Sequence, residues 1–237
     1  SEFDFPLMWA LRSAIAEERA PMSSIGSAIE NSLAAWEGSG AVMTAMIGNH
    51  DVPRFSSLSA GQAGGDGFDP APQPTDASVY GKQQLALALL FTLPEAPVVY
   101  YGDEVGLAGR ADPDTRRPMP ADDVLTGGQR AVRDVTRLLG RARRCSPSLR
   151  RGTYRALAAD DEHLIFAREL SGEDTAIVAV TRNAAAAFVT TLSGVPAGDW
   201  TDVMTGRNLT LGPGPITLPK GDRTVALYFP AGSGCTR

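Results

Sequence analysis

The chain has 237 residues, of which 43% are hydrophobic and 21% charged, with a net charge of −5 and a pI near 5.1. This length suffices for one large domain or two modest ones with a sizeable core. The acidic balance argues against a nucleic-acid partner or an acidic membrane surface, because both favour a basic face. No apolar run in the sequence reaches the roughly 18 residues that a membrane-spanning helix needs.

The sequence holds two cysteines, Cys145 and Cys235. Two are too few for a zinc cluster or a disulfide framework. Their pairing cannot be read from the sequence, so the redox compartment stays open.

The first part of the chain opens with a short strand, predicted over residues 2–5. A helix over 7–18 follows, and Pro6 suits its first turn. A second helical segment covers 27–38. Residues 41–48, AVMTAMIG, form a nearly continuous apolar run, which is typical of a strand buried on both faces in a parallel sheet.

Residues 56–77, rich in Gly, Ser, Pro and Asp, predict a long surface loop. A helix is expected over 77–94, with Pro94 just past its end, and a second apolar strand over 96–104. A polar loop over 105–124 leads to a helix over 127–144, whose arginine-rich end would complement the helix dipole. Strands alternating with helices indicate a parallel α/β arrangement.

The pattern changes near residue 150. Short apolar runs then alternate with turn signals roughly every 8–12 residues, and no helical period is visible, which is typical of an antiparallel β-sandwich. We therefore expect an α/β part in residues 1–147 and an all-β part in residues 148–237.

Both apolar runs of the first part end in glycine followed by polar residues. One gives Gly48-Asn49-His50-Asp51 and the other Gly102-Asp103-Glu104. In a (β/α)8 barrel, active sites lie where strands end, whereas Gly, Asn and Asp are also ordinary turn residues. A turn is the simpler explanation for 102–104. A site is favoured for 49–51, because an imidazole beside a carboxylate is costly to hold unless solvated or paired.

These motifs, in this order, resemble the end of the catalytic barrel of the alpha-amylase family of glycoside hydrolases. EFDFPLMWAL, AVMTAMIGNHD and APVVYYGDE look like its sixth, seventh and eighth strands, and the region after residue 145 is similar to the following β-sandwich. ADPDTRRPM (111–119) and SPSLRRGTYRAL (146–157) most resemble the branch of neopullulanases, cyclomaltodextrinases and maltogenic amylases. The resemblance implies the last three strands and helices of an incomplete (β/α)8 barrel over 1–147, followed by an antiparallel β-sandwich over 148–237.

Retaining cleavage of an α-glycosidic bond needs a carboxylate nucleophile and a carboxylic acid about 5–5.5 Å apart. Further groups grip the sugar as it flattens in the transition state. The resemblance implies that Asp51 is such a third, transition-state-stabilising carboxylate, and that His50 binds the same sugar. Arg54 is a further substrate-binding candidate, with a surface turn as the alternative.

Two supporting sets complete the expected site. Asp112 and Arg116 match a D-P-x-x-R pattern that binds a more distant glucose in related enzymes, with a loop salt bridge as the alternative. Asn49, Asp103 and Glu104 are expected behind the sugar-contacting residues. Tyr100 and Tyr101 are either core residues or sugar platforms, and we expect at least one in the core.

The family's nucleophilic Asp and acid Glu follow its fourth and fifth strands, upstream of the sixth. We therefore expect them on chain that precedes this sequence, which would make it an inactive C-terminal fragment. Its partners would be the missing N-terminal half of the barrel and an α-glucan such as starch, maltodextrin or cyclodextrin. No metal or cofactor is expected among these residues, and calcium stays open for the full-length protein.

Two other hypotheses stay open. A catalytically inactive relative could serve as a scaffold or glycan-binding protein, since a fold does not fix a function. Alternatively, the sandwich could be a glycan-binding module. Its aromatic residues fall in strand patterns and are predicted to be core, namely Phe166, Phe188, Trp200, Tyr228 and Phe229.

Overall fold

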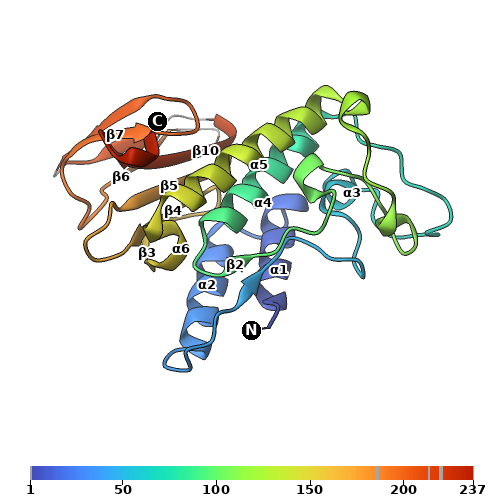
Figure 1. Cartoon of the computed structure of the whole chain (residues 1–237), viewed down its shortest axis with the longest axis horizontal. Coiled ribbons are helices and arrows are strands. Elements are labelled where there is room, and N and C mark those ends of the chain that lie inside the picture. Colours follow the sequence, from blue (N-terminus) through green and yellow to red (C-terminus); the bar gives the residue numbers. More distant parts are fainter. Residues whose placement is uncertain (1, 185–186, 213, 219–220, 237) are drawn as a thin grey trace.

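The computed structural model describes residues 2–184, 187–212, 214–218 and 221–236 (Figure 1). Its helical segments are α1 (Phe5–Leu11), a π-helical turn (Arg12–Ala16), α2 (Ser23–Ala35), α3 (Phe55–Ser59), α4 (Ala77–Thr92), α5 (Gly127–Cys145) and α6 (Pro147–Arg151). Its strands are β1 (Thr44–Ala45), β2 (Ala96–Pro97), β3 (Thr153–Ala159), β4 (His163–Glu169), β5 (Ala176–Ala184), β6 (Phe188–Thr190), β7 (Gly198–Asp202), β8 (Asn208–Leu211), β9 (Ile216–Leu218) and β10 (Gly221–Pro230).

Three extended segments lie side by side and run in the same direction. Phe3 forms a parallel bridge with Thr44 of β1, and β1 pairs with β2 in parallel, Thr44 opposite Ala96. The expected parallel arrangement is thus present, but regular pairing is shorter than predicted. The strand expected over 2–5 is only a bridge, because Asp4 accepts a hydrogen bond from the Leu7 amide at 2.8 Å and starts α1 at Phe5.

Helix α4 lies at the centre of the molecule and is buried nearly all round. It packs against α5 on one side and against β5 and β10 on another (Figure 1). A helix that is apolar on every face is expected to be buried in this way. Asp76 caps its first turn, and α5 begins with a capping box of Thr126 and Gln129.

Two short helices were missed by the sequence analysis, and one of them makes a loop prediction wrong in part. The predicted loop over 56–77 begins with the short helix α3, whose first residue, Phe55, is fully buried. The segment between α5 and β3, for which no element was predicted, also contains a short helix, α6, which Ser146 caps and Pro147 begins. In both places a single short helical turn buries an apolar side chain, a signal too short for periodicity to reveal.

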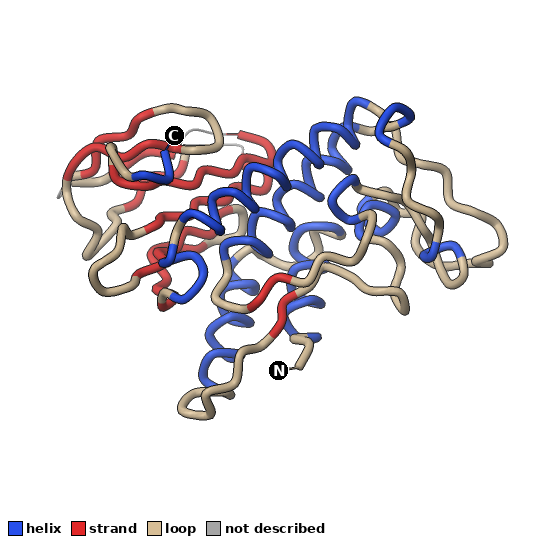
Figure 2. The backbone as a smooth tube through the Cα atoms, in the orientation of Figure 1, coloured by secondary structure: helices blue, strands red, loops and turns tan. Residues whose placement is uncertain are grey.

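In the described part of the chain, β3, β4, β5, β10, β7 and β8 form one antiparallel sheet in that order, and β6 pairs with β9. Figure 2 shows the strands of this region, in red, gathered at one end of the molecule. One face of the large sheet carries Phe166, Val178 and Phe229 into the same core as the helices. The other face carries Ile165 and Trp200 into a second, smaller core. One hydrophobic core therefore crosses the predicted boundary at residues 147 and 148.

The aromatic residues predicted as core are so placed. Phe166, Trp200 and Phe229 are buried, while Phe188 and Tyr228 pack half-buried against the second core.

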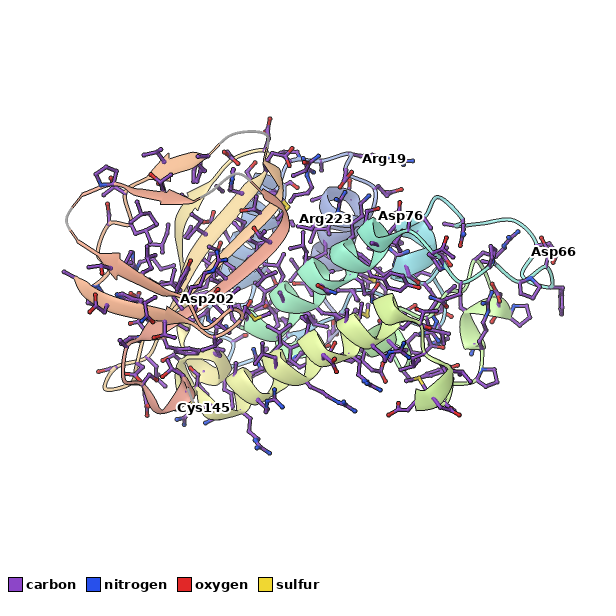
Figure 3. All side chains as sticks on the ribbon, turned by 90° about the horizontal axis from the view of Figure 1, so that it is seen from above. Arg19, Asp66, Asp76, Cys145, Asp202 and Arg223 are labelled. Carbon is purple, nitrogen blue, oxygen red and sulfur yellow. A yellow bond between two sulfur atoms is a disulfide. The ribbon has the colours of Figure 1, made fainter. Side chains whose placement is uncertain are left out.

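Cys145 at the end of α5 forms a disulfide with Cys235, 90 residues away. Figure 3 shows Cys145 far from Asp66, which lies at one end of the molecule. None of the helices in the described ranges has the length and apolar character that crossing a membrane requires.

Candidate active site

The loop that carries His50 and Asp51 follows the buried residues Met46 and Ile47 beyond β1. The side-chain oxygen of Asn49 accepts a hydrogen bond from the Asp51 amide at 2.8 Å, which closes a local turn. His50 Nε2 lies 3.1 Å from Asp51 Oδ1, and the two side chains are 51% and 69% exposed. The structure thus places the predicted pair together, open to solvent.

A second loop brings two more predicted residues to this surface. Arg116 Nε lies 2.5 Å from Asp112 Oδ1, and Arg116 Nη2 lies 4.0 Å from Asp51 Oδ1. The hydrogen bond to Asp112 raises the pKa of Arg116, so its positive charge is secure. The loop salt bridge between Asp112 and Arg116 is therefore present, and the same guanidinium also faces Asp51.

Asp114 anchors this second loop, a role that the sequence analysis missed. Its buried carboxylate accepts hydrogen bonds from the amides of Ala71 and Arg110 and from the guanidinium of Arg117. Burial alone would raise the pKa of Asp114, but these hydrogen bonds outweigh it and hold the pKa below its ordinary value. The loop is thus fixed from beneath while Asp112 and Arg116 stay exposed.

Arg54 does not reach the surface where Asp51 lies. Its side chain is fully buried, and its guanidinium packs over the rings of Tyr100 and Tyr101 at 4.3 and 4.7 Å. Its Nε donates to the carbonyl of Thr115 at 3.0 Å, and Nη1 donates to that of Tyr101. In this structure neither alternative of the sequence analysis, a sugar contact or a surface turn, describes Arg54, because the closely packed loops enclose it.

Asp103 lies beneath the exposed residues, facing Arg54 at 3.7 Å. Burial, opposed by the positive charge of Arg54, reinforced by Glu104 and opposed again by Arg12, raises the pKa of Asp103 to about 7. Asp103 Oδ2, Arg54 Nη2 and Glu104 Oε2 are buried without a hydrogen-bond partner among the atoms described. The layer under the site is therefore charged and closely packed.

The two tyrosines differ in their surroundings. Tyr100 is half-buried, and its ring centroid lies 6.4 Å from that of His50. Tyr101 is 40% exposed and donates from its hydroxyl to the carbonyl of Arg117 at 2.9 Å. Both rings lie edge to face at 4.8 Å. Neither is a fully buried core residue, and Tyr101 forms part of the exposed rim.

Two residues that the sequence analysis did not single out hold the loop of Asp51. Thr115 Oγ1 donates to the carbonyl of His50 at 3.0 Å. Arg12 donates to the carbonyls of Ile47 and Pro53 at 3.0 and 2.8 Å. The signal for Arg12 was a charged residue inside an apolar helical run. Within the described ranges, no three His, Cys, Asp or Glu side chains converge as a metal site would require.

Comparisons with known proteins identify the family of this chain. The sequence model of the alpha-amylase catalytic domain matches residues 4–146, more than half of the chain. A cyclomaltodextrin glucanotransferase of Bacillus sp. (strain 17-1) is 30% identical over 195 residues, which are 78% of this chain and 24% of the relative. A cyclomaltodextrinase of Thermoanaerobacter pseudethanolicus is 31% identical over 137 residues, 58% of this chain and 21% of the relative.

The fold agrees as well. A structure of an AmyP variant in complex with maltotriose matches with a TM-score of 0.82 at 19% identity, covering 97% of this chain and 50% of that one. The chain thus spans about a quarter of the curated relatives and half of this solved chain. The matched residues 4–146 include the loops of Asp51 and Asp112, and the chain belongs to the alpha-amylase family of glycoside hydrolases.

Proposed function

We propose that this chain supplies the C-terminal part of the catalytic unit of a retaining glycoside hydrolase that acts on α-glucans. Residues 1–147 would contribute the last strands and helices of a (β/α)8 barrel, and 148–237 a C-terminal β-sandwich. The observation that carries the proposal is the exposed pair of His50 and Asp51 at the end of β1, beside the parallel strand β2. This is the end of a barrel strand at which catalytic groups gather.

Asp51 is proposed as the carboxylate that stabilises the transition state. An ionised carboxylate accepts hydrogen bonds from sugar hydroxyls, and those that strengthen as the ring flattens lower the barrier. His50 at 3.1 Å adds a ring nitrogen to the same surface, and Arg116 adds a cation 4.0 Å from Asp51. We propose that His50, Asp112 and Arg116 bind sugar hydroxyls, and that Arg54, Asn49, Asp103 and Glu104 support them.

The nucleophile and the general acid are proposed to lie outside this chain, on the N-terminal half of the barrel. The substrate class is supported by the relatives' names, which refer to cyclomaltodextrins, and by the maltotriose bound to the structural neighbour. Starch, maltodextrins and cyclodextrins all belong to that class. We propose no cofactor among the residues of this chain.

The proposal is tested in the full-length protein that contains this chain, with maltodextrin and cyclodextrin as substrates. Asp51→Asn should lower kcat by about 10²–10³-fold, because the neutral amide no longer matches the positive charge of the transition state. Asp123→Asn is the matched control: it makes the same change on an exposed turn and should leave kcat unaltered. A kcat for Asp51→Asn equal to that of this control would refute the role.

The supply of the other two groups is tested separately. The purified 237-residue chain should not hydrolyse maltodextrin, and adding the N-terminal half of the barrel should restore activity. Hydrolysis by the pure chain, abolished by Asp51→Asn, would show that the chain carries its own nucleophile and acid.

A further inference from the structure

Arg12 is a buried cation under the loop that carries Asp51. It is the first residue of the π-helical turn after α1, and only 2% of its surface is exposed. Its Nη1 donates to the carbonyl of Ile47 at 3.0 Å, and its Nη2 donates to the carbonyl of Pro53 at 2.8 Å. These carbonyls stand at the two ends of the segment 48–52, so one guanidinium spans the base of the loop.

The fit between this guanidinium and the loop is close. A Cβ placed on Gly48 would lie 3.4 Å from Arg12 Nη1, so the backbone of the loop lies directly on the guanidinium. The same guanidinium lies over the ring of Trp9, whose centroid is 5.6 Å from Arg12 Cζ. Only the planar fork of arginine presents two donors that reach both carbonyls at once; the ammonium of lysine is a single point.

Burying this cation is costly, and the structure offsets the cost with charge. Burial lowers the pKa of Arg12 to about 10, opposed by the attraction of Asp103 and Glu17, so the group stays charged at neutral pH. Asp103 also faces Arg54, the residue that follows Pro53. Two cations and one carboxylate thus lie beneath the loop. Apolar residues in the same space would avoid the desolvation cost of these charges.

We propose that Arg12 is a positioning residue for Asp51, because its two hydrogen bonds fix both ends of the loop on which that carboxylate stands. The inference rests on the proposed function of Asp51, although Arg12 itself touches no substrate. Positioning of this kind matters for rate, since a catalytic group misplaced by about 1 Å can cost a factor of about 100.

The variant Arg12→Lys keeps the positive charge but removes the two-donor guanidinium. The variant Arg12→Met removes both the charge and the donors. Arg143→Lys is the matched control. Arg143 also spans carbonyls, donating to those of Phe91 and Leu93 at 2.9 Å and to that of Glu95 at 2.8 Å, but it does so at the end of α4, away from the loop of Asp51. Both lysine variants remove a guanidinium that spans backbone carbonyls, but only Arg12→Lys removes it from the loop of Asp51.

Hydrogen exchange and steady-state kinetics are compared among the variants, each at the same interval below its own unfolding midpoint. Amide hydrogen exchange on the 237-residue chain should be at least about 10-fold faster at residues 48–52 in Arg12→Lys than in Arg143→Lys. In the full-length protein, kcat should fall about 10- to 100-fold for Arg12→Lys while KM stays within about threefold, because Asp51 acts mainly in the transition state. Arg143→Lys should leave both constants unchanged.

Equal amide exchange at residues 48–52 in the two lysine variants, or an unchanged kcat for Arg12→Lys, would overturn the positioning role. Failure of the proposed function has a different signature, because Asp51→Asn would then keep its activity whatever the loop does. Arg12→Met should be at least as severe as Arg12→Lys in both readouts. A milder effect of Arg12→Met than of Arg12→Lys would also argue against a role of the two-donor guanidinium.

Discussion

Thr115 Oγ1 donates a hydrogen bond to the carbonyl oxygen of His50 at 3.0 Å, across 65 positions of sequence. This bond joins the loop of Asp112 and Arg116 to the loop of Asp51. Thr115 is fully buried, and its own carbonyl accepts from Arg54 at 3.0 Å. The buried residues Thr115 and Arg54 therefore keep the exposed residues of the candidate site aligned without reaching the surface themselves.

Thr115→Val should loosen the alignment of the two loops while changing the shape of the buried side chain very little. The valine leaves the carbonyl of His50 without its donor, which should lower the free energy of unfolding by about 1 kcal/mol in urea titrations. It should also weaken maltotriose binding by the full-length protein. Thr136→Val is the control, because Thr136 Oγ1 donates at 2.8 Å to the Val132 carbonyl within α5. Equal maltotriose affinity in both variants would contradict a role in aligning the site.

Asp103 should make stability depend on pH in the acidic range. Burial raises its pKa from 3.8 to about 7. Between these values the folded protein keeps a proton that the unfolded chain releases, so the free energy of unfolding falls as the pH rises from about 4 to about 7. Asp103→Asn should remove this contribution. The check is denaturant unfolding of both proteins across that range, and a difference between them that is independent of pH would be inconsistent with it.

The disulfide between Cys145 and Cys235 should contribute strongly to stability. It closes a loop of 90 residues and joins the end of α5 to the C-terminal segment after β10. In the chain-entropy account, a cross-link over that separation destabilises the unfolded chain by about 4.6 kcal/mol. Dithiothreitol should therefore lower the unfolding midpoint of the native chain. The double variant Cys145→Ser with Cys235→Ser should start at the lower midpoint and not respond to the reductant.

Arg182 connects the antiparallel sheet to the helices. From β5 it donates to the carbonyls of Ala14 and Ala20 at 2.8 and 2.7 Å, and it pairs with Glu162 at 2.8 Å. Arg182→Met should lower the free energy of unfolding by about 2–3 kcal/mol, because hydrogen bonds to a charged donor are lost from a buried place.

Arg155→Met provides the comparison for Arg182. Arg155 makes a similar pair with Glu169 at 2.6 Å, but its side chain is 34% exposed and remains within the sheet region. Its loss should cost only about 1 kcal/mol or less. Guanidinium chloride unfolding distinguishes the two, and equal costs would argue against Arg182 as a connection between sheet and helices.

Local patterns in the sequence determined much of this protein. The helix over 77–94 was predictable from its apolar composition and from Pro94, and the observed α4 ends at Thr92. The parallel order of the two apolar runs and the pairing of His50 with Asp51 also followed from sequence, because a buried strand that ends in polar residues places them at one edge. Each of these predictions was drawn from the residue pattern within a single run.

Only the tertiary structure decided which charged residues lie inside. Arg54 and Asp103 carry no local mark of burial, and for Arg12 the sequence shows only the apolar run around it. Arg54 donates to the carbonyls of Tyr101 and Thr115, Arg12 donates to those of Ile47 and Pro53, and Asp103 faces Arg54. The same holds for the disulfide and for the core shared by helices and sheet. Burial of a charge is set by what packs around it from elsewhere in the chain, and a local pattern of residues contains no information on that packing.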